Sequence, residues 1–248
     1  MNKILKTILK VLIFGILTIT TQIGGVAYLI SVYLNRKWKT KLRLKPIITF
    51  LVVYLIFTIM ITPLLAPLFG REKVKNTDII KPTNYMTVLL NRNYVKPNLN
   101  KLLENAEKEL KNSGIKIHYL DANFPFINKF PLLPHLSHND GKKIDISLIY
   151  EEISTGKISP RKKSLSGYGV FESPKPNEYN QVEKCLNNGY FQYDYPKYLT
   201  FGEINADLTF SEKGTKKVIS SFLKSKSLGK LFFGRQLKHW ENFFSLTS

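Results

Sequence analysis

The sequence predicts an α+β domain preceded by two transmembrane helices. Two long segments near the N-terminus carry no charged residue, and each exceeds the roughly 20 apolar residues that cross a bilayer as a helix. From about Asn76 the composition becomes that of a soluble domain, in which helical and strand patterns follow one another without regular alternation. We therefore expect a membrane anchor over residues 1–75 and a folded domain over residues 76–248.

The anchor is predicted from the uncharged runs 11–34 and 46–70, with helices over about 11–34 and 46–69. A signal peptide is the alternative for the first run, which follows a basic N-terminus. That run is too long for the core of a signal peptide, and a second apolar run follows it closely. The loop 35–45 between them is rich in Lys and Arg, which keeps such a loop in the cytoplasm. This orientation places the N-terminus and the domain outside, at a bacterial inner membrane, facing the periplasm or cell wall.

The charge distribution supports a membrane protein rather than a nucleic-acid-binding protein. The formal net charge is +19, and the first 75 residues contain twelve Lys and Arg residues with a single acid, Glu72. Most of the excess therefore lies beside apolar segments, where it acts as a topology signal, and no nucleic-acid-binding motif is present. The single cysteine, Cys185, excludes an intrachain disulfide and a cysteine-based zinc site. We therefore expect the lipid bilayer to be a partner of this protein, and we do not expect it to bind nucleic acid.

Apolar periodicity places the elements of the domain. Residues 98–114 have one apolar stripe at helical spacing and end at Gly114, where a C-terminal cap belongs. Alternation of apolar and polar residues predicts strands, with His118 on the polar face of the first. We expect strands over 115–120, 142–150 and 229–233, a turn at 154–157, a short strand at 198–201, a second helix over 211–226 and a helical tail over 235–244.

The stretch LSHNDGKKIDI, residues 136–146, combines residue types found in metal sites. His138 lies in a loop, Gly141 allows the chain to turn, and Asp145 lies on the strand face opposite its apolar residues. Imidazole and carboxylate are ordinary zinc ligands, and a catalytic zinc has three protein ligands with one position open to water. Bound zinc lowers the pKa of that water and polarises a carbonyl, as amide hydrolysis requires. By spacing alone, a polar turn with Asp145 paired to a nearby lysine is the simpler interpretation.

The longer stretch PHLSHNDGKKIDI resembles the first metal motif of the LAS metallopeptidases, Ser-x-His-x-x-Gly-x-x-x-Asp. These enzymes have the D-Ala-D-Ala carboxypeptidase and hedgehog-like zinc fold, and the Ser-His pair is most similar to the penicillin-insensitive murein endopeptidase branch. The resemblance implies a hydrolase with zinc held by His138 and Asp145, acting on peptidoglycan peptide cross-links. It assigns His135 and Ser137 to substrate contacts or to the surroundings of the metal, and Gly141 to the turn.

The second half of the family's site is not visible in the sequence. The family takes its third ligand and its catalytic base from a C-terminal strand, with His-x-x-His-x-His or Glu-x-x-His. The last histidine here is His239, preceded at those offsets by Gln236 and Leu237, so neither motif is present. His239 is a weak substitute ligand, and His135 is a local one. The third alternative, which we favour, is a shortened or frame-altered chain with an incomplete site and no strand after 229–233.

Two classes of function follow from these observations. The first is a membrane-anchored, zinc-dependent peptidase acting on peptidoglycan cross-links, whose catalytic residues the sequence leaves unknown. The second is a catalytically inactive or truncated membrane protein that binds the cell wall or serves as a scaffold.

Overall fold

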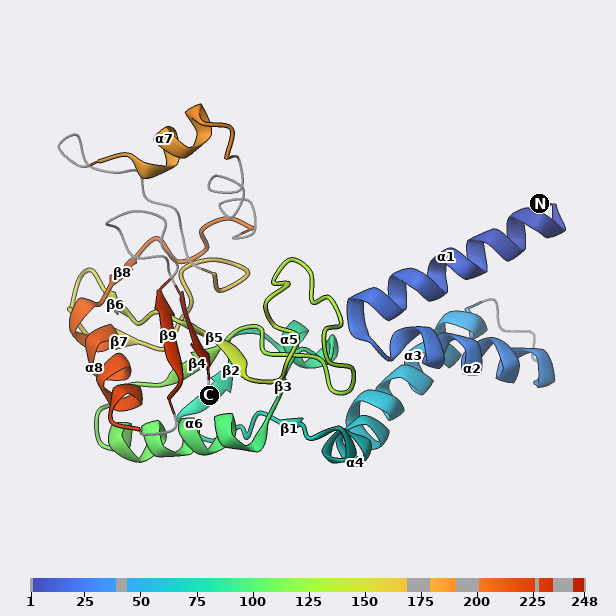
Figure 1. Cartoon of the computed structure of the whole chain (residues 1–248), viewed down its shortest axis with the longest axis horizontal. Coiled ribbons are helices and arrows are strands. Elements are labelled where there is room, and N and C mark those ends of the chain that lie inside the picture. Colours follow the sequence, from blue (N-terminus) through green and yellow to red (C-terminus); the bar gives the residue numbers. More distant parts are fainter. Residues whose placement is uncertain are drawn as a thin grey trace. The chain divides into compact units, whose positions relative to one another are not determined.

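The computed structural model describes residues 2–38, 44–168, 179–190, 201–225, 228–233 and 243–247, and has the mixed α+β composition expected, with helices at the N-terminus (Figure 1). Its chain divides into two compact units. The helical unit contains Met1–Val74, Met86–Pro97 and Ala122–Gly141, and the sheet unit contains Lys75–Tyr85, Asn98–Asp121 and Lys142–Ser248. The helical unit thus includes two later segments that apolar periodicity did not assign to it.

The first predicted membrane segment is not one helix. Helix α1 spans Lys3–Thr21 and helix α2 spans Gly24–Lys37, and Gln22 between them has a φ of +66°. The hydroxyl of Thr21, the last residue of α1, accepts a 2.8 Å hydrogen bond from the N–H of Gly24, the first residue of α2. The predicted helix over 11–34 is therefore wrong in its bounds, and its C-terminal half is a 14-residue helix only about 21 Å long.

Two glycines let α1 and α2 approach closely. A Cβ on Gly25 would lie 2.0 Å from the hydroxyl of Thr18 and 2.8 Å from the ring of Phe14. A Cβ on Gly24 would lie 2.8 Å from the carbonyl of Leu17. Small residues allow such contact between apolar helices, so α1 and α2 form a tight hairpin.

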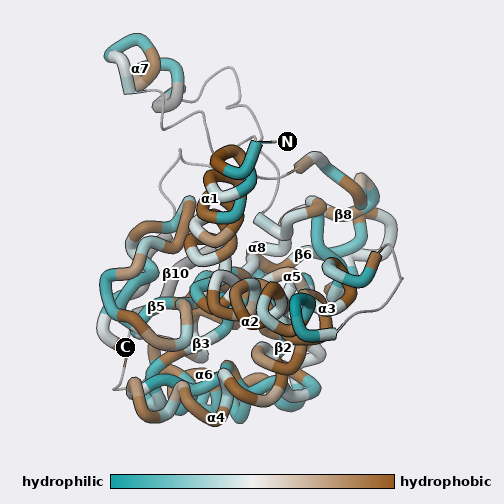
Figure 2. The backbone as a smooth tube through the Cα atoms, turned by 90° about the vertical axis from the view of Figure 1, so that its right-hand side faces the viewer, coloured by the Kyte–Doolittle hydropathy of each residue, from teal (hydrophilic) through white to brown (hydrophobic). Residues whose placement is uncertain are grey.

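The second apolar segment continues from Lys45 to Phe69 through four consecutive helical pieces: α3 (Lys45–Ile56), the π-helix η1 (Phe57–Ile61), α4 (Thr62–Leu65) and the 3₁₀-helix η2 (Ala66–Phe69). Among the described residues, two helices are long and apolar enough to cross a membrane, Lys3–Thr21 and Lys45–Phe69. The apolar residues along these helices are brown in Figure 2. The share of buried residues is 6 % in the first and 22 % in the second, so other parts of the chain cover part of the second helix.

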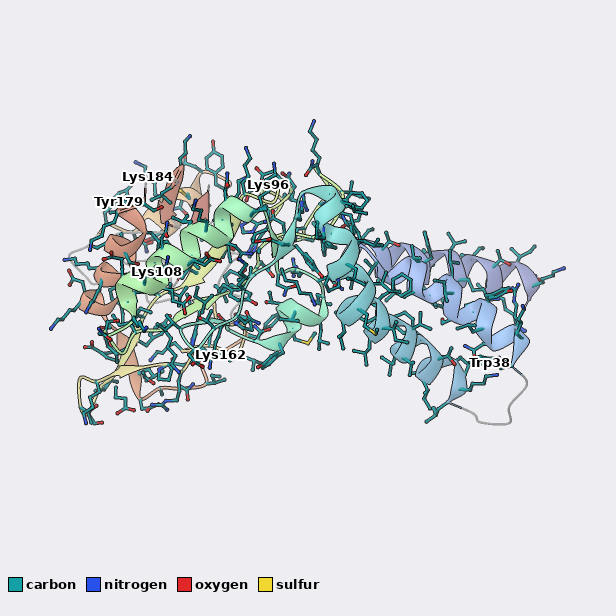
Figure 3. The ribbon with its side chains drawn as sticks, turned by 90° about the horizontal axis from the view of Figure 1, so that it is seen from below. Trp38, Lys96, Lys108, Lys162, Tyr179 and Lys184 are labelled. Atoms are coloured by element: carbon teal, nitrogen blue, oxygen red, sulfur yellow. The ribbon has the colours of Figure 1, made fainter. Side chains whose placement is uncertain are left out.

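The start of α1, the end of α2 and the start of α3 lie toward one end of the helical unit. Helix α2 packs against α1 and against α3, and the hydroxyl of Thr49 donates to Asn35 at 3.1 Å. The N-terminus, the end of α2 and the start of α3 therefore lie together, away from Gln22 (Figure 1). Figure 3 labels Trp38 at this end of α2. The expectation that the N-terminus and the basic loop lie at opposite ends is wrong, because the break at Gln22 adds one reversal of the chain.

The remaining elements of the helical unit are short. Strands β1 (Glu72–Lys73) and β3 (Tyr94–Val95) pair antiparallel. Most of the short helix α5 (Tyr85–Leu89) also belongs to this unit.

The sheet unit is built on a five-stranded sheet of order β2-β4-β5-β10-β9. Its strands are β2 (Ile80–Pro82), β4 (Ile117–Tyr119), β5 (Lys143–Ser147), β10 (Phe243–Thr247) and β9 (Lys230–Phe233). Strand β2 is parallel to β4, and the other pairs are antiparallel. A second sheet has the order β7-β6-β8, with β6 (Tyr150–Glu152), β7 (Ile158–Ser159) and β8 (Leu208–Phe210).

The helices of the sheet unit follow the predicted periodicity. Helix α6 (Pro97–Leu110) buries its whole predicted stripe, and the chain leaves it through Gly114 at a φ of +72°. Helix α8 (Glu212–Leu223) buries Val218 and Phe222, and α7 (Gln181–Asn187) is shorter. The turn expected at 154–157 is confirmed, with Gly156 at a φ of +63°. The strand expected at 198–201 lies outside the described residues, except for Phe201.

The C-terminal segment differs from expectation. Residues 243–247 form β10, which lies between β5 and β9, so a strand does follow residues 230–233. The helical tail predicted for 235–244 is therefore wrong at Phe243 and Phe244. Its remaining residues, 235–242, lie outside the described part of the chain. Pairing with two neighbouring strands decides the conformation of this apolar segment, and local spacing does not.

Candidate functional site

His138 is held in a fixed orientation within the helical unit. Its side chain is 3 % exposed, and its Nδ1 lies 2.7 Å from the carbonyl oxygen of Ala122. Because a carbonyl only accepts, this contact makes Nδ1 the protonated nitrogen and leaves the lone pair on Nε2. Histidines that bind metals are oriented in this way by a hydrogen bond from the other ring nitrogen. The side chain of His138 is therefore prepared to act as a ligand through Nε2.

Arg71 is the main support of the loop that carries His138. It follows the second long helix directly, is 1 % exposed, and donates from its guanidinium to the carbonyl of Phe124. Its Nη2 also donates to Asn128 at 2.6 Å and to the carbonyl of Asn139 at 3.3 Å. Burial lowers the pKa of Arg71, and the nearby charge of Asp140 raises it. An arginine remains charged under these conditions, so the loop is bound to a buried cation.

Gly141 makes the turn that the sequence predicts. It has a φ of +80°, its N–H donates to the side chain of Asn123 at 3.0 Å, and its carbonyl accepts from the N–H of Lys96 at 2.7 Å. A Cβ at this position would lie 3.1 Å from Nε of Arg71. Glycine is therefore required both by the backbone conformation and by the approach of Arg71.

The structure brings His135 and His138 together and turns Ser137 outward. The two imidazole rings lie 5.6 Å apart, and the N–H of His138 donates to the carbonyl of His135 at 2.9 Å. Ser137 is exposed, and His135 is partly exposed. His135 is thus the predicted site residue with a direct contact to His138 in the helical unit.

Asp145 lies in β5 of the sheet unit, in the middle of a buried strand. Its side chain is 2 % exposed, and its Oδ2 accepts a 3.2 Å hydrogen bond from the hydroxyl of Tyr168. Its N–H donates to the carbonyl of Asp121, and its carbonyl accepts from the N–H of Leu120. Both faces of β5 are buried, since Ile144 is also fully buried. The strand has an apolar face and a polar face, as expected, but the polar face that carries Asp145 is buried in the protein and does not face solvent.

Tyr168 is a site residue that the sequence did not identify. Its hydroxyl donates to Asp145 and accepts from the N–H of Asp121 at 3.3 Å. The residue lies between Gly167 and Gly169, in a block to which the sequence assigns no chemistry. The one feature that could have drawn attention to Tyr168 is its position between two glycines. No sequence pattern near it indicates a contact with Asp145, which lies 23 residues away.

Strand β10 occupies the position beside Asp145. Its residue Ser245 is the register partner of Asp145, and Phe244 pairs with Ile146. The sequence of β10, FFSLT, contains no histidine, cysteine, aspartate or glutamate. The strand next to the proposed metal ligand therefore brings no further metal-binding side chain.

The described residues do not assemble a complete metal site. Within the ranges that the structure describes, no group of three or more His, Cys, Asp or Glu side chains is close enough to hold a metal ion. His138 and Asp145 belong to different units, and the weak candidate His239 lies outside the described residues. The donors present fit a metal in part: one oriented imidazole and one buried carboxylate.

A further histidine, the partly exposed His118, lies in β4 and lines a small pocket of the sheet unit with Lys116, Ser147, Ser159 and Arg161. Burial lowers the pKa of His118 to about 4, and the charges of Lys116 and Lys81 act in the same direction. His118 is therefore neutral at pH 7 and has no carboxylate among the groups that shift its pKa.

Comparison with protein-family models and with curated proteins finds no match to this chain. The fold and the site therefore define the protein only by class, as an α+β protein with apolar N-terminal helices and a buried histidine on an arginine-supported loop.

Proposed function

We propose that this chain is a membrane-anchored, extracytoplasmic protein of the zinc-peptidase type that acts on peptidoglycan peptide cross-links. Its metal-binding residues are His138 and Asp145. The observation that carries the proposal is the bond between Nδ1 of His138 and the carbonyl of Ala122, which fixes the orientation of the imidazole as a hydrogen bond from the other ring nitrogen does in metal-binding histidines. The resemblance of residues 134–146 to the LAS metal motif supplies the substrate class, and the proposal includes the hedgehog-like fold.

The arrangement of the helices supports the anchoring. Since α1 and α2 form a hairpin, the lysines near the start of α1 lie toward the same end as Arg36 and Lys37 at the end of α2 and Lys45 at the start of α3. The positive-inside rule assigns that end to the cytoplasm. The opposite end, with Gln22 and Arg71, then faces the periplasm, and both basic segments satisfy the rule together. A hairpin followed by one further crossing gives a domain on the side of the cell wall.

The two proposed ligands have different supports. The N–H of Asp145 is bonded to the carbonyl of Asp121, and the ring of His138 is bonded to the carbonyl of Ala122, the next residue in the sequence. The hydroxyl of Tyr168 also holds one oxygen of Asp145. A zinc ion bound here would polarise a peptide carbonyl and activate water. The residues of this chain orient the ligands, and the described part offers no third one.

Strand β10 favours a second candidate function, which is binding of peptidoglycan peptides without hydrolysis. It lies beside β5 where the family's third ligand and base are expected, yet carries none of the required residue types. Two protein ligands hold zinc weakly, and a metal without a positioned base hydrolyses amides slowly. In this second candidate the protein retains the groove of a peptidase and works as a wall-binding protein.

The proposal is tested by measuring zinc and muropeptide turnover with the full chain in detergent. Zinc is measured by mass spectrometry after dialysis against a buffered zinc solution, in the wild type, His138→Ala and Asp145→Asn. The control is His118→Gln, which removes a histidine outside the site. We expect zinc to be lost in the first two variants and retained in the control. Zinc content that is the same in all four proteins would refute the metal site.

Purified cross-linked muropeptides then distinguish the two candidate functions. Release of monomers that requires zinc and is lost in His138→Ala indicates a peptidase. Zinc-dependent binding without release indicates the wall-binding protein. Neither binding nor release by a zinc-loaded chain would contradict peptidoglycan as the substrate class.

A further inference from the structure

The helical unit has an apolar surface outside its long helices. Two of its later segments, 86–97 and 122–141, carry large apolar side chains that are 40–56 % exposed. This apolar shelf consists of Met86, Leu89, Ile127, Leu133 and Leu136. Scattered apolar residues on a surface are ordinary, but five on two short segments of one unit indicate an interaction site.

The first segment is attached to the middle of the second long helix. The hydroxyl of Tyr54 donates to the carbonyl of Leu89 at 2.6 Å. The side chain of Asn91, which is fully buried, donates to the hydroxyls of Tyr54 and Thr58, both at 3.2 Å. Tyr54 lies nine residues from Lys45, about 14 Å along the helix. The shelf residue Leu89 is therefore at the level of the helix interior, well before its end at Phe69.

The second segment is attached to the first segment and to the hairpin. The guanidinium of Arg92 donates to the carbonyl of Leu133. The N–H of Phe126 donates to the side chain of Gln22 at 2.8 Å, and the ring of Phe126 lies 5.0 Å from that of Phe69. Two of the residues concerned belong to the shelf: Leu133, whose carbonyl Arg92 binds, and Ile127, which follows Phe126 in the sequence. Both segments thus lie against helices that the proposed function places in the membrane.

A segment bonded to the interior of a membrane helix has to satisfy two conditions at that depth. Its polar backbone groups need partners within the protein, and its outward side chains need to be apolar. The first condition is met by Tyr54, Asn91, Arg92 and Gln22, which bond backbone or side-chain groups of the segments or the helices. The second condition is met by the shelf residues.

We infer that the apolar shelf enters the hydrocarbon core of the bilayer, with lipid acyl chains as its partner. The inference rests on the membrane anchoring of the proposed function and goes beyond it. The two later segments of the helical unit are then seated in the membrane together with its long helices. Since His138 lies on the second shelf segment, that histidine stays at the bilayer surface.

The test measures the depth of single spin labels in the full chain. Cys185 is the only cysteine and is replaced in a Cys185→Ser background. Labels are placed by Met86→Cys and Leu133→Cys on the shelf. Leu51→Cys on α3, 50 % exposed, is the control within the long helix, and Ile153→Cys in the sheet unit, 64 % exposed, is the control for water. The proteins are reconstituted in phosphatidylethanolamine and phosphatidylglycerol vesicles, and collision rates with oxygen and with a water-soluble nickel chelate are compared.

Oxygen partitions into the bilayer and the nickel chelate does not. We expect the ratio of oxygen to nickel collisions at both shelf positions to exceed that at residue 153 by about tenfold and to approach that at residue 51. Ratios at residues 86 and 133 equal to that at residue 153, with a high ratio at residue 51, would overturn the shelf and leave the anchoring intact. A low ratio at residue 51 as well would overturn both.

Discussion

Replacement of Arg71 by glutamine should release the loop that carries His138. In the wild type the guanidinium donates to one fully buried carbonyl, that of Phe124, and to the partly buried oxygens of Asn128 and Asn139. A hydrogen bond from a charged donor contributes about 1.5–3 kcal/mol, and a buried acceptor without a partner costs about 1–3 kcal/mol. Since water reaches two of the acceptors, we expect a local loss of about 3 kcal/mol, less than the sum of three bonds.

Hydrogen exchange followed by mass spectrometry measures this loss directly. A free energy of about 3 kcal/mol corresponds to roughly a hundredfold faster exchange. The acceleration should be confined to residues 122–141, where the N–H groups of Lys129, His138 and Gly141 are hydrogen-bonded. Arg71→Lys, which keeps the charge but not the planar fork, should lie between the wild type and Arg71→Gln.

Arg161→Gln is the matched control. Arg161 is also bonded to more than one oxygen, on Asp207 and Glu152, but its side chain is 42 % exposed. Its loss should leave residues 122–141 unchanged, because exposed ion pairs contribute little to stability. If exchange in that segment is the same in Arg71→Gln as in the wild type, Arg71 does not support the loop and the reasoning fails.

Three further predictions concern single residues. Gly141→Ala should lower the free energy of unfolding by about 2 kcal/mol, and more than Gly156→Ala, which has a similar φ but no neighbour within 4 Å; equal losses would show that close contact has no role. Gly25→Ala should accelerate exchange at the hairpin, while Gly15→Ala, with no neighbour within 4 Å, should not. The pKa of His118 is lowered to about 4, so the unfolded chain binds the proton first. Stability should therefore fall by up to about 3 kcal/mol between pH 6.5 and pH 4, measured by urea unfolding, and His118→Gln should remove this dependence.

The parts of the fold that local periodicity determines were predictable. The stripe of α6 results from burying one set of side chains, and the pattern is visible in a single segment. The break at Gln22 was missed because the prediction used the length of an uncharged apolar segment. That length is the same whether or not the segment contains a turn. The residues TTQIGG contained the signal, since the hydroxyl of Thr21 bonds the first N–H of α2 and two glycines follow.

The supports of the site could not be predicted, because they join residues that are distant in the sequence. Arg71 and Phe124 lie 53 residues apart, and Tyr168 and Asp145 lie 23 apart. The motif predicted His138, Asp145 and the turn at Gly141, of which the structure confirms the turn. The conformation of Phe243 and Phe244 was predicted wrongly, since a short apolar run fits a helix or a strand until its partners are known.

The position of β10 has a consequence for folding kinetics. It is an interior strand of the five-stranded sheet, yet its partner β5 lies on the far side of the whole segment from Leu148 to Asn242. Closing so long a loop is entropically unfavourable before any pairing compensates for it, and folds dominated by such distant pairings form slowly. Until β10 arrives, β5 presents an unpaired edge that another chain could occupy. The sheet unit should therefore depend on chaperones more than its small size suggests.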